Sequence, residues 1–146
     1  MREKITRFME KQRVASVCCT ERNCEPYCFS CFYVFDSEAM LLYFKSTPTS
    51  HHFSLLQPGA VVAGTILPDK LNVMAIRGIQ FTGTVLAEDD ALAGHASSSY
   101  HKKLPFALAM PGAVTAIRLD TIKMTDNTAG FGKKINWSRA TEPVEA

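Results

Sequence analysis

Cysteine and histidine are the residue types in this 146-residue chain that most readily carry chemistry. Cys24, Cys28 and Cys31 include a C-x-x-C spacing, and His51 and His52 add two imidazoles, so all the side-chain types of a zinc site are present. However, Cys28 and Cys31 lie in an apolar run typical of a strand, where residues three apart point to opposite faces. We therefore predict no metal site. The thiols expected to be reduced and mostly buried are Cys18, Cys19, Cys24, Cys28 and Cys31.

Nucleophilic catalysis by a cysteine paired with a histidine is a weaker possibility. Five cysteines and four histidines make some pairing inevitable by chance, and no local signature marks a nucleophile. The sequence singles out no catalytic acid, base or nucleophile.

Residues 45–52 combine the groups that bind a phosphate. Thr47 suits a helix N-cap and Pro48 suits the first helical position, which predicts a short helix that continues to residue 57. Free backbone N–H groups, hydroxyls and imidazoles would then surround the start of the helix, and Lys45 adds a cation. An ordinary capped helix with solvent-facing histidines explains the same residues and stays open as the alternative.

A second candidate segment, residues 125–134, places two glycines around an aromatic residue and ends in Lys133 and Lys134. Glycine lets the backbone approach a planar or charged ligand closely. A glycine-rich turn between two strands, with solvated lysines, is the alternative interpretation.

The elements that position these groups are mostly strands. Apolar periodicity predicts helices over 1–12, 51–57 and 89–103, and strands over 14–20, 26–36, 39–45, 60–67, 73–87, 113–124 and 132–137. The strand at 26–36 is expected to be buried on both faces. Six or seven antiparallel strands with small helices favour a mainly β fold closed into a barrel, which protects the sheet edges. We expect one domain over 1–137 and a flexible tail over 138–146.

Composition excludes several classes of protein. A net charge of +2 gives no electrostatic reason to expect nucleic acid as a partner, and no apolar run reaches the length of a membrane span. The first residues are charged rather than apolar, as in a protein without a signal peptide, and the odd number of cysteines argues against a secreted disulfide framework. We therefore expect a cytoplasmic protein that binds neither nucleic acid nor membranes.

Several segments, in order and spacing, resemble one known family. These are CFSCFYVFD at 28–36, STPTSHH at 46–52, VVAGTI at 61–66, AIRGIQFTG at 75–83 and DNTAGFGKK at 126–134. The pattern is similar to that of the uncharacterised bacterial YhbP-like family, within the pyridoxamine 5′-phosphate oxidase-like FMN-binding split barrels. The resemblance extends over residues 1–137.

The resemblance implies a homodimer that holds FMN in clefts between its subunits. It assigns the flavin phosphate to Lys45, Ser46, Ser50, His51 and His52. It assigns the ring system to Phe29, Ser30, Cys31 and Phe32, with Arg77 and Gly78 on the long strand, and Lys133 of the GFGKK segment closing the cleft from the partner chain.

This chain departs from the oxidases in two places. His51 and His52 replace an Arg-Lys pair at the phosphate, and only Tyr100 of a Tyr–Arg–Ser set for the vitamin phosphate is kept, since Leu104 and Leu108 occupy the other positions. Oxidation of pyridoxamine phosphate is therefore not expected, because the bidentate arginine is lost. The resemblance then implies a flavin-dependent oxidoreductase or flavin reductase with an unknown small-molecule substrate.

Two alternatives from other classes remain open. One is a haem-binding or haem-handling barrel. Its axial ligand would be one of His51, His52, His95 and His101. The other is a binding module without any cofactor.

Overall fold

The computed structural model describes residues 2–129 and 133–141. Its strands are β1 (Val14–Thr20), β2 (Pro26–Asp36), β3 (Leu41–Ser46), β4 (Val61–Ile66), β5 (Arg77–Val85), β6 (Ala113–Asp126) and β7 (Lys134–Ser138). The helices are α1 (Arg2–Lys11), α2 (His51–Leu55) and α3 (Ala96–Lys103), with short 3₁₀ turns at Ala91–Ala93, Pro105–Ala109, Asn127–Ala129 and Arg139–Thr141.

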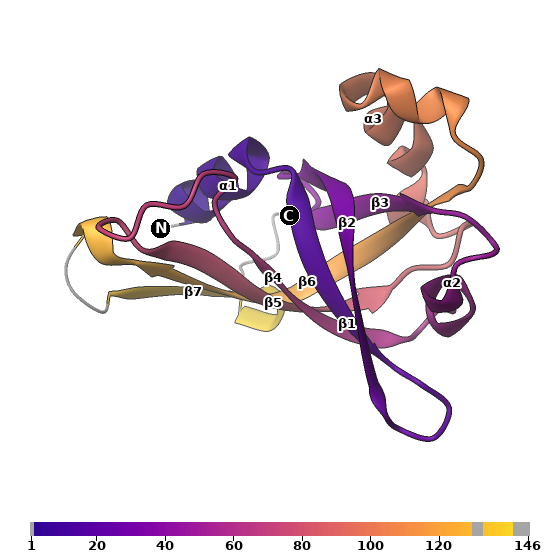
Figure 1. Cartoon of the computed structure of the whole chain (residues 1–146), viewed down its shortest axis with the longest axis horizontal. Coiled ribbons are helices and arrows are strands. Elements are labelled where there is room, and N and C mark those ends of the chain that lie inside the picture. Colours follow the sequence, from indigo (N-terminus) through magenta and orange to yellow (C-terminus); the bar gives the residue numbers. More distant parts are fainter. Residues whose placement is uncertain (1, 130–132, 142–146) are drawn as a thin grey trace.

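The seven strands form one antiparallel sheet in the order β3-β2-β1-β4-β5-β6-β7. β3 also pairs with β6, which closes six of the strands into a barrel and leaves β7 outside it. Figure 1 shows α1 at one end of the barrel, and α2 and α3 toward the other. The expected mainly β barrel with six to seven antiparallel strands and small helices is confirmed.

The main hydrophobic core fills the barrel, and α1 covers one end of it. Ile5, Phe8 and Met9 of α1 are buried against the inward side chains of the strands, as an amphipathic helix requires. The hydroxyl of Tyr33 donates to the carbonyl of Met9 over 2.6 Å, which ties β2 to the end of α1. This end of the barrel is therefore sealed within the chain itself.

A second, smaller core lies outside the barrel, between β3 and α3. Leu41 and Tyr43 of β3 pack there with Ala96, Tyr100 and Ala107. Because the alternate residues of β3 face the barrel interior, β3 is buried on both faces.

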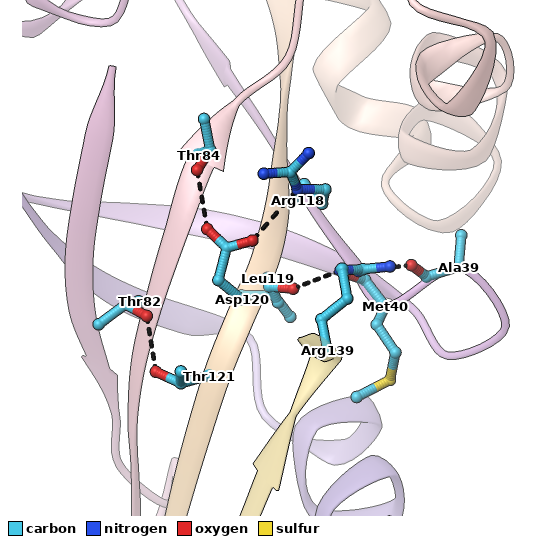
Figure 2. Close-up of polar contacts among 9 residues, drawn as sticks. All are labelled: Ala39, Met40, Thr82, Thr84, Arg118, Leu119, Asp120, Thr121 and Arg139. Atoms are coloured by element: carbon cyan, nitrogen blue, oxygen red, sulfur yellow. Dashed lines mark hydrogen bonds and ion pairs between the residues drawn. The ribbon is translucent and has the colours of Figure 1, made fainter. Parts of the chain in front are cut away.

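A β-bulge interrupts the pairing of β5 with β6. Thr82 pairs with Thr121 and Gly83 with Leu119, so Asp120 has no opposite residue. Figure 2 shows its carboxylate accepting from Thr84 Oγ1 at 2.7 Å, and from Arg118 Nε at 3.1 Å. The bulge therefore turns a short acidic side chain toward its polar neighbours on the outside of the barrel.

The structure corrects the sequence interpretation of two strands. β2 is buried on both faces only at residues 33–35, because β3 and α3 cover it there, whereas residues 26–32 are exposed or half-buried. The strand expected over 73–87 begins at Arg77, since β4 ends at Ile66, opposite Ile79, and offers no partner to the apolar residues 73–76.

Other boundaries also differ from the prediction: α2 ends at Leu55 rather than at residue 57, for example. Residues 89–103 form a 3₁₀ turn followed by α3, rather than one helix. Ser138 ends β7 instead of beginning a tail, and Arg139 donates to the carbonyls of Ala39, Met40 and Leu119 (Figure 2). Residues 142–146 of the expected tail lie outside the described residues.

Within residues 2–129 and 133–141, no helix has the length and apolar character that a bilayer span requires.

Candidate functional site

His52 lies in an aromatic cluster at the end of the barrel near α2. Its ring stacks on Phe29, with centroids 3.8 Å apart and planes inclined by 8°, and its centroid is 6.5 Å from that of Phe44. Burial in this cluster, and then the nearby charge of His51, lower the pKa of His52. The cluster thus favours the neutral form of the imidazole.

His51 is more exposed and faces the β1–β2 hairpin. Its Nε2 lies 2.7 Å from Glu21 Oε1, and its ring meets Tyr27 edge-on at 4.7 Å. Glu21 and Tyr27 did not emerge from the sequence as site residues. The signal was available, because Tyr27 and Phe29 are two apart on one strand and so share the face that α2 approaches.

The turn before α2 corrects the predicted helix start. Thr47 is not an N-cap. It closes a turn, with the N–H of Ser50 donating to its carbonyl at 3.0 Å and its hydroxyl 2.9 Å from that of Ser50. α2 begins at His51 and has five residues, so its dipole is short and the hydroxyls and imidazoles must supply most of any anion binding.

Ser46 supplies an unsatisfied polar group beside this turn. Its side chain is buried, and its Oγ has no hydrogen-bond partner among the described residues. Ser46 shares the inner face of β3 with Phe44, whose ring adjoins His52. A buried hydroxyl normally has a partner, so Ser46 fits a site that binds an oxygen-rich ligand.

Lys45 does not join this group. It lies on the opposite face of β3, where its Nζ is 2.9 Å from His101 Nε2 and donates to the carbonyl of Ala107 at 2.7 Å. Since an ammonium group only donates, His101 accepts at Nε2 and carries its proton on Nδ1, which lies 2.9 Å from the carbonyl of Ser97. Lys45 therefore anchors α3 to the barrel.

The outer half of β2 presents an open backbone edge. Hydrogen bonds from Tyr33 N to Arg13 O (3.0 Å) and from Glu21 N to Glu25 O (2.8 Å) set the alternation of the β1–β2 ladder. Odd-numbered residues of β2 direct their backbone groups to β1, and even-numbered ones direct theirs away. β3 pairs only with residues 33–36. In the described part of the chain, no strand therefore covers the outward backbone groups of Cys28 and Ser30 or the N–H of Phe32.

The side chains expected along the ring system divide between two faces of β2. Phe29 and Cys31 point inward and pack against the core, and burial raises the pKa of Cys31 to about 12. Ser30 and Phe32 point outward. Phe32 meets Phe106 edge-on at 6.1 Å and, with Val14 and Leu67, lines an open hollow of about 520 Å³ on the outside of the barrel.

Arg77, Gly78 and Lys133 lie at the other end of the barrel, near α1. Arg77 begins β5, and its guanidinium is 5.9 Å from the ring centre of Phe8. Lys133 lines a surface hollow with residues of α1. At about 3.4 Å per residue, Val85 at the far end of β5 lies about 27 Å from Arg77. Val85 is the end of β5 near α2, because it lines a cavity together with Phe53 of that helix. One chain therefore does not bring these residues to the His52 cluster. Residues 130–132 of the GFGKK segment lie outside the described residues.

The cysteines are less buried than predicted. Cys19 is buried and Cys31 half-buried, but Cys18, Cys24 and Cys28 are exposed, because they lie on the open outer face of the sheet or in the hairpin turn. Cys28 and Cys31 do face apart, as predicted. No group of three or more potential metal ligands occurs within residues 2–129 and 133–141.

A cavity of about 640 Å³ lies between α2, α3 and the start of β6, with His101 in its wall. Its size is that of a ligand pocket. The three positions that correspond to the oxidases' vitamin-phosphate set are not grouped into a site: Tyr100, which is kept, is buried between α3 and β3, Leu104 packs against the same cluster, and Leu108 is exposed.

Comparison of the sequence with known proteins identifies relatives of this chain. No family model matches the chain. It is 35% identical over 142 residues to the UPF0306 protein YhbP of Escherichia fergusonii, which covers 97% of this chain and 96% of the relative. It is 38% identical over 136 residues to a UPF0306 protein of Citrobacter koseri, covering 93% of this chain and 92% of the relative.

Two solved structures share the fold at low identity. A heme binding protein from Mycobacterium smegmatis superposes with a TM-score of 0.73 at 12% identity and covers 94% of this chain, which spans only 57% of that protein. An FAD binding protein from the same organism superposes with a TM-score of 0.63 at 10% identity, over 83% of this chain and 93% of the other. These likenesses establish the split-barrel fold.

Proposed function

Because the chain belongs to the UPF0306 (YhbP) family, we propose that it is an FMN-binding, flavin-dependent oxidoreductase of the pyridoxamine 5′-phosphate oxidase-like split barrels. It acts in the cytoplasm on a small-molecule substrate other than pyridoxamine phosphate. The observation that carries the proposal is the open edge of β2 beside the His51–His52 turn.

The β2 edge suits the isoalloxazine ring. Its uncovered N–H and C=O groups at Cys28 and Ser30, followed by the N–H of Phe32, alternate along the strand, and a flavin's pyrimidine edge alternates carbonyl oxygens with an N–H. Such an edge binds an added strand or any ligand with the same alternation of donors and acceptors. When bound, the flavin supplies the electron-transfer chemistry, and the protein supplies its position and electrostatic surroundings.

The turn before α2 suits the flavin phosphate. Ser46 has a buried hydroxyl without a partner among the described residues, and Ser50, His51 and His52 follow within one turn. These groups hold the phosphate by hydrogen bonds, and protonation of the imidazoles strengthens them. Lys45 is not part of this set because His101 and Ala107 engage it.

A second copy of the chain completes the cleft. Arg77, Gly78 and Lys133 are too far from the α2 turn to reach the same flavin within one chain, so they are contributed by the partner. Exposed apolar side chains around the outer hollow supply a surface for that contact: Val14, Phe32, Leu67 and Phe106. Light scattering should give the mass of a dimer, and Phe32→Glu should give a monomer that binds FMN more weakly.

The edge contact has a selective test in Ser30→Pro. Proline at this position removes an N–H that points away from β1, so the β1–β2 ladder is retained. FMN and riboflavin titrations, followed by flavin fluorescence, should show about tenfold weaker binding, the scale of one lost backbone bond together with the bulk of the proline ring. Ser30→Ala keeps the N–H and is the matched control. Equal affinities in the two variants would exclude flavin from this edge.

Haem is the second candidate, because a heme binding protein shares the fold and His101 lines the 640 Å³ cavity. Its Nε2 is occupied by Lys45, so haem ligation there requires Lys45 to move away. The absorbance spectrum of freshly purified protein separates the candidates: flavin bands support the first, and a Soret band supports the second.

A further inference from the structure

Cys18 and Cys28 form a close pair of exposed thiols on the outer face of the barrel. They lie directly opposite each other on β1 and β2, and their sulfur atoms are 3.2 Å apart. Both are exposed, and the neighbour of Cys18 on β4 is the small residue Ala63. A small reagent in solvent can therefore reach the pair.

The position of this pair in the ladder favours a covalent link. Hydrogen-bonded pairs of the β1–β2 ladder fall at Arg13–Tyr33 and Glu21–Glu25, so alternation makes Cys18–Cys28 a non-hydrogen-bonded pair. The Cα atoms of such pairs are about 4.5 Å apart, within the range that a disulfide spans. The sulfur atoms need to approach by roughly 1 Å to reach the S–S bond length of about 2.05 Å.

We infer that Cys18 and Cys28 form a reversible thiol–disulfide couple, a redox site whose thiols face away from the His52 cluster, with low-molecular-weight disulfides as its oxidants. The inference does not depend on the proposed function. The side chains of Cys18 and Cys28 lie on the outer face of the sheet, whereas the aromatic cluster of His52 lies on its inner face.

The reaction balances over two exchange steps. The thiolate of one cysteine attacks a sulfur atom of the small disulfide, whose S–S bond breaks, and one small thiol leaves with a proton. The second cysteine thiolate then attacks the protein sulfur of the mixed disulfide and displaces the second small thiol. The two cysteines lose two electrons and two protons, and the small disulfide is reduced to two thiols.

The other cysteines are poorly placed to compete. Cys19 and Cys31 face the interior and pack against the core, so a reagent in solvent reaches them less readily than the exposed Cys18 and Cys28. Cys24 is exposed but sits in the hairpin turn, beyond the last rung, Thr20–Pro26. Figure 1 shows this turn projecting away from the barrel. The geometry therefore selects a single intramolecular pairing.

Equilibration of the reduced 146-residue protein with glutathione mixtures tests the inference. After the thiols are trapped by alkylation, intact mass and peptide mapping should show loss of two hydrogens and one Cys18–Cys28 bond, fully reversed by dithiothreitol. In Cys28→Ser, Cys18 has no resolving partner and should keep one glutathione. That adduct should be roughly a hundredfold less abundant in the unmodified sequence, because a neighbouring thiol displaces it intramolecularly.

Cys24→Ser is the matched control, because it removes an exposed thiol that has no partner sulfur nearby and should behave as the unmodified sequence does. The inference is overturned by a bond that involves Cys19, Cys24 or Cys31, by a disulfide between two chains, or by stable glutathione adducts on Cys18 and Cys28 without an internal bond. Circular dichroism of each variant checks that the barrel is folded.

Discussion

The imidazole of His52 lies parallel to the phenyl ring of Phe29, 3.8 Å away, and this stacking places a titratable group against the inner face of the hairpin. The contact joins helix α2 to strand β2, which are separated along the chain by β3. Two predictions depend on it.

The first prediction concerns stability in mild acid. Burial, and then the charge of His51, lower the pKa of His52 in the folded protein, so the unfolded chain binds this proton more readily. The contribution of His52 to stability is therefore complete above about pH 6.5, the unfolded value, and declines as the pH falls toward the folded pKa. His52→Gln should reduce the slope of unfolding free energy against pH below 6.5, as measured by urea denaturation. His95→Gln, at an exposed histidine, should keep the original slope.

The second prediction concerns FMN. A bound phosphate favours the imidazolium form, so binding raises the pKa of His52 and takes up a proton. By reciprocity, FMN affinity should fall by about fivefold, or about 1 kcal/mol, as the pH rises from about 6 to 8. Riboflavin lacks the phosphate and should show little change. His52→Gln should remove most of the pH dependence, and the same FMN dissociation constant at both pH values would place the phosphate elsewhere.

The third prediction separates two roles for Lys45. Its contacts with His101 and Ala107 anchor α3 and the turn that follows it, so Lys45→Met should lower the free energy of unfolding by about 1–2 kcal/mol. Limited proteolysis should cut first within residues 96–110. The FMN affinity of Lys45→Met should stay within about twofold of the original value. If it fell as far as that of His52→Gln, Lys45 would be a phosphate ligand after all.

The fourth prediction concerns acid unfolding through Asp126. Its carboxylate is 1% exposed, accepts from the N–H of Thr128 at 2.9 Å and lies 3.1 Å from Lys4 Nζ. Burial by itself raises the pKa of Asp126, but the Thr128 donors and Lys4 outweigh it, and the net pKa lies below the usual value. The stability that Asp126 contributes is complete above about pH 4, and is lost as the pH falls through the folded pKa.

Asp126→Asn should therefore lower the free energy of unfolding by about 1–2 kcal/mol at neutral pH. It should also reduce the slope of the unfolding free energy against pH below about pH 4. Lys4→Met removes only the solvent-exposed partner and should cost less than about 1 kcal/mol. If Asp126→Asn left the pH dependence of the unfolding free energy in acid unchanged, other carboxylates would be responsible for acid unfolding.

Much of the fold was predictable from the sequence, because alternation of side chains along strands is a strong local signal. The bounds of β1 and β2 agree with the prediction, and the inward direction of Cys19 and outward direction of Cys18 follow from period two alone. The incorrect predictions concerned burial, which depends on the neighbouring strands as well as on the strand's own sequence. Nothing in the apolar composition of residues 26–36 reveals that β3 covers only the last part of that strand.

The candidate site was predictable only in part, for a similar reason. Ser50, His51 and His52 lie together because they are consecutive in the chain, whereas Lys45 points away because β3 alternates and α3 and the following turn engage its ammonium group. Glu21 reaches His51 only through the hairpin, which no local pattern reveals, whereas the alternation of β2 does place Tyr27 on the same face as Phe29. The Cys18–Cys28 pair likewise depends on the register of two strands, which the spacing of cysteines along the chain does not determine.

The β3–β6 pairing that closes the barrel also bears on how the chain folds. It joins Ser46 to Ala113 and Leu41 to Arg118, residues more than sixty positions apart, while most other neighbouring strands are joined by short connections. The entropy cost of closing so long a loop must be met before the contacts repay it, so high contact order predicts slow folding in which the hairpins form early and the seam closes last. Hydrogen exchange during refolding should protect β1–β2 and β2–β3 before β3–β6. A circular permutant that joins residue 146 to residue 1 and opens the chain between β4 and β5 would bring β3 and β6 no nearer along the sequence, so it should retain the slow final phase.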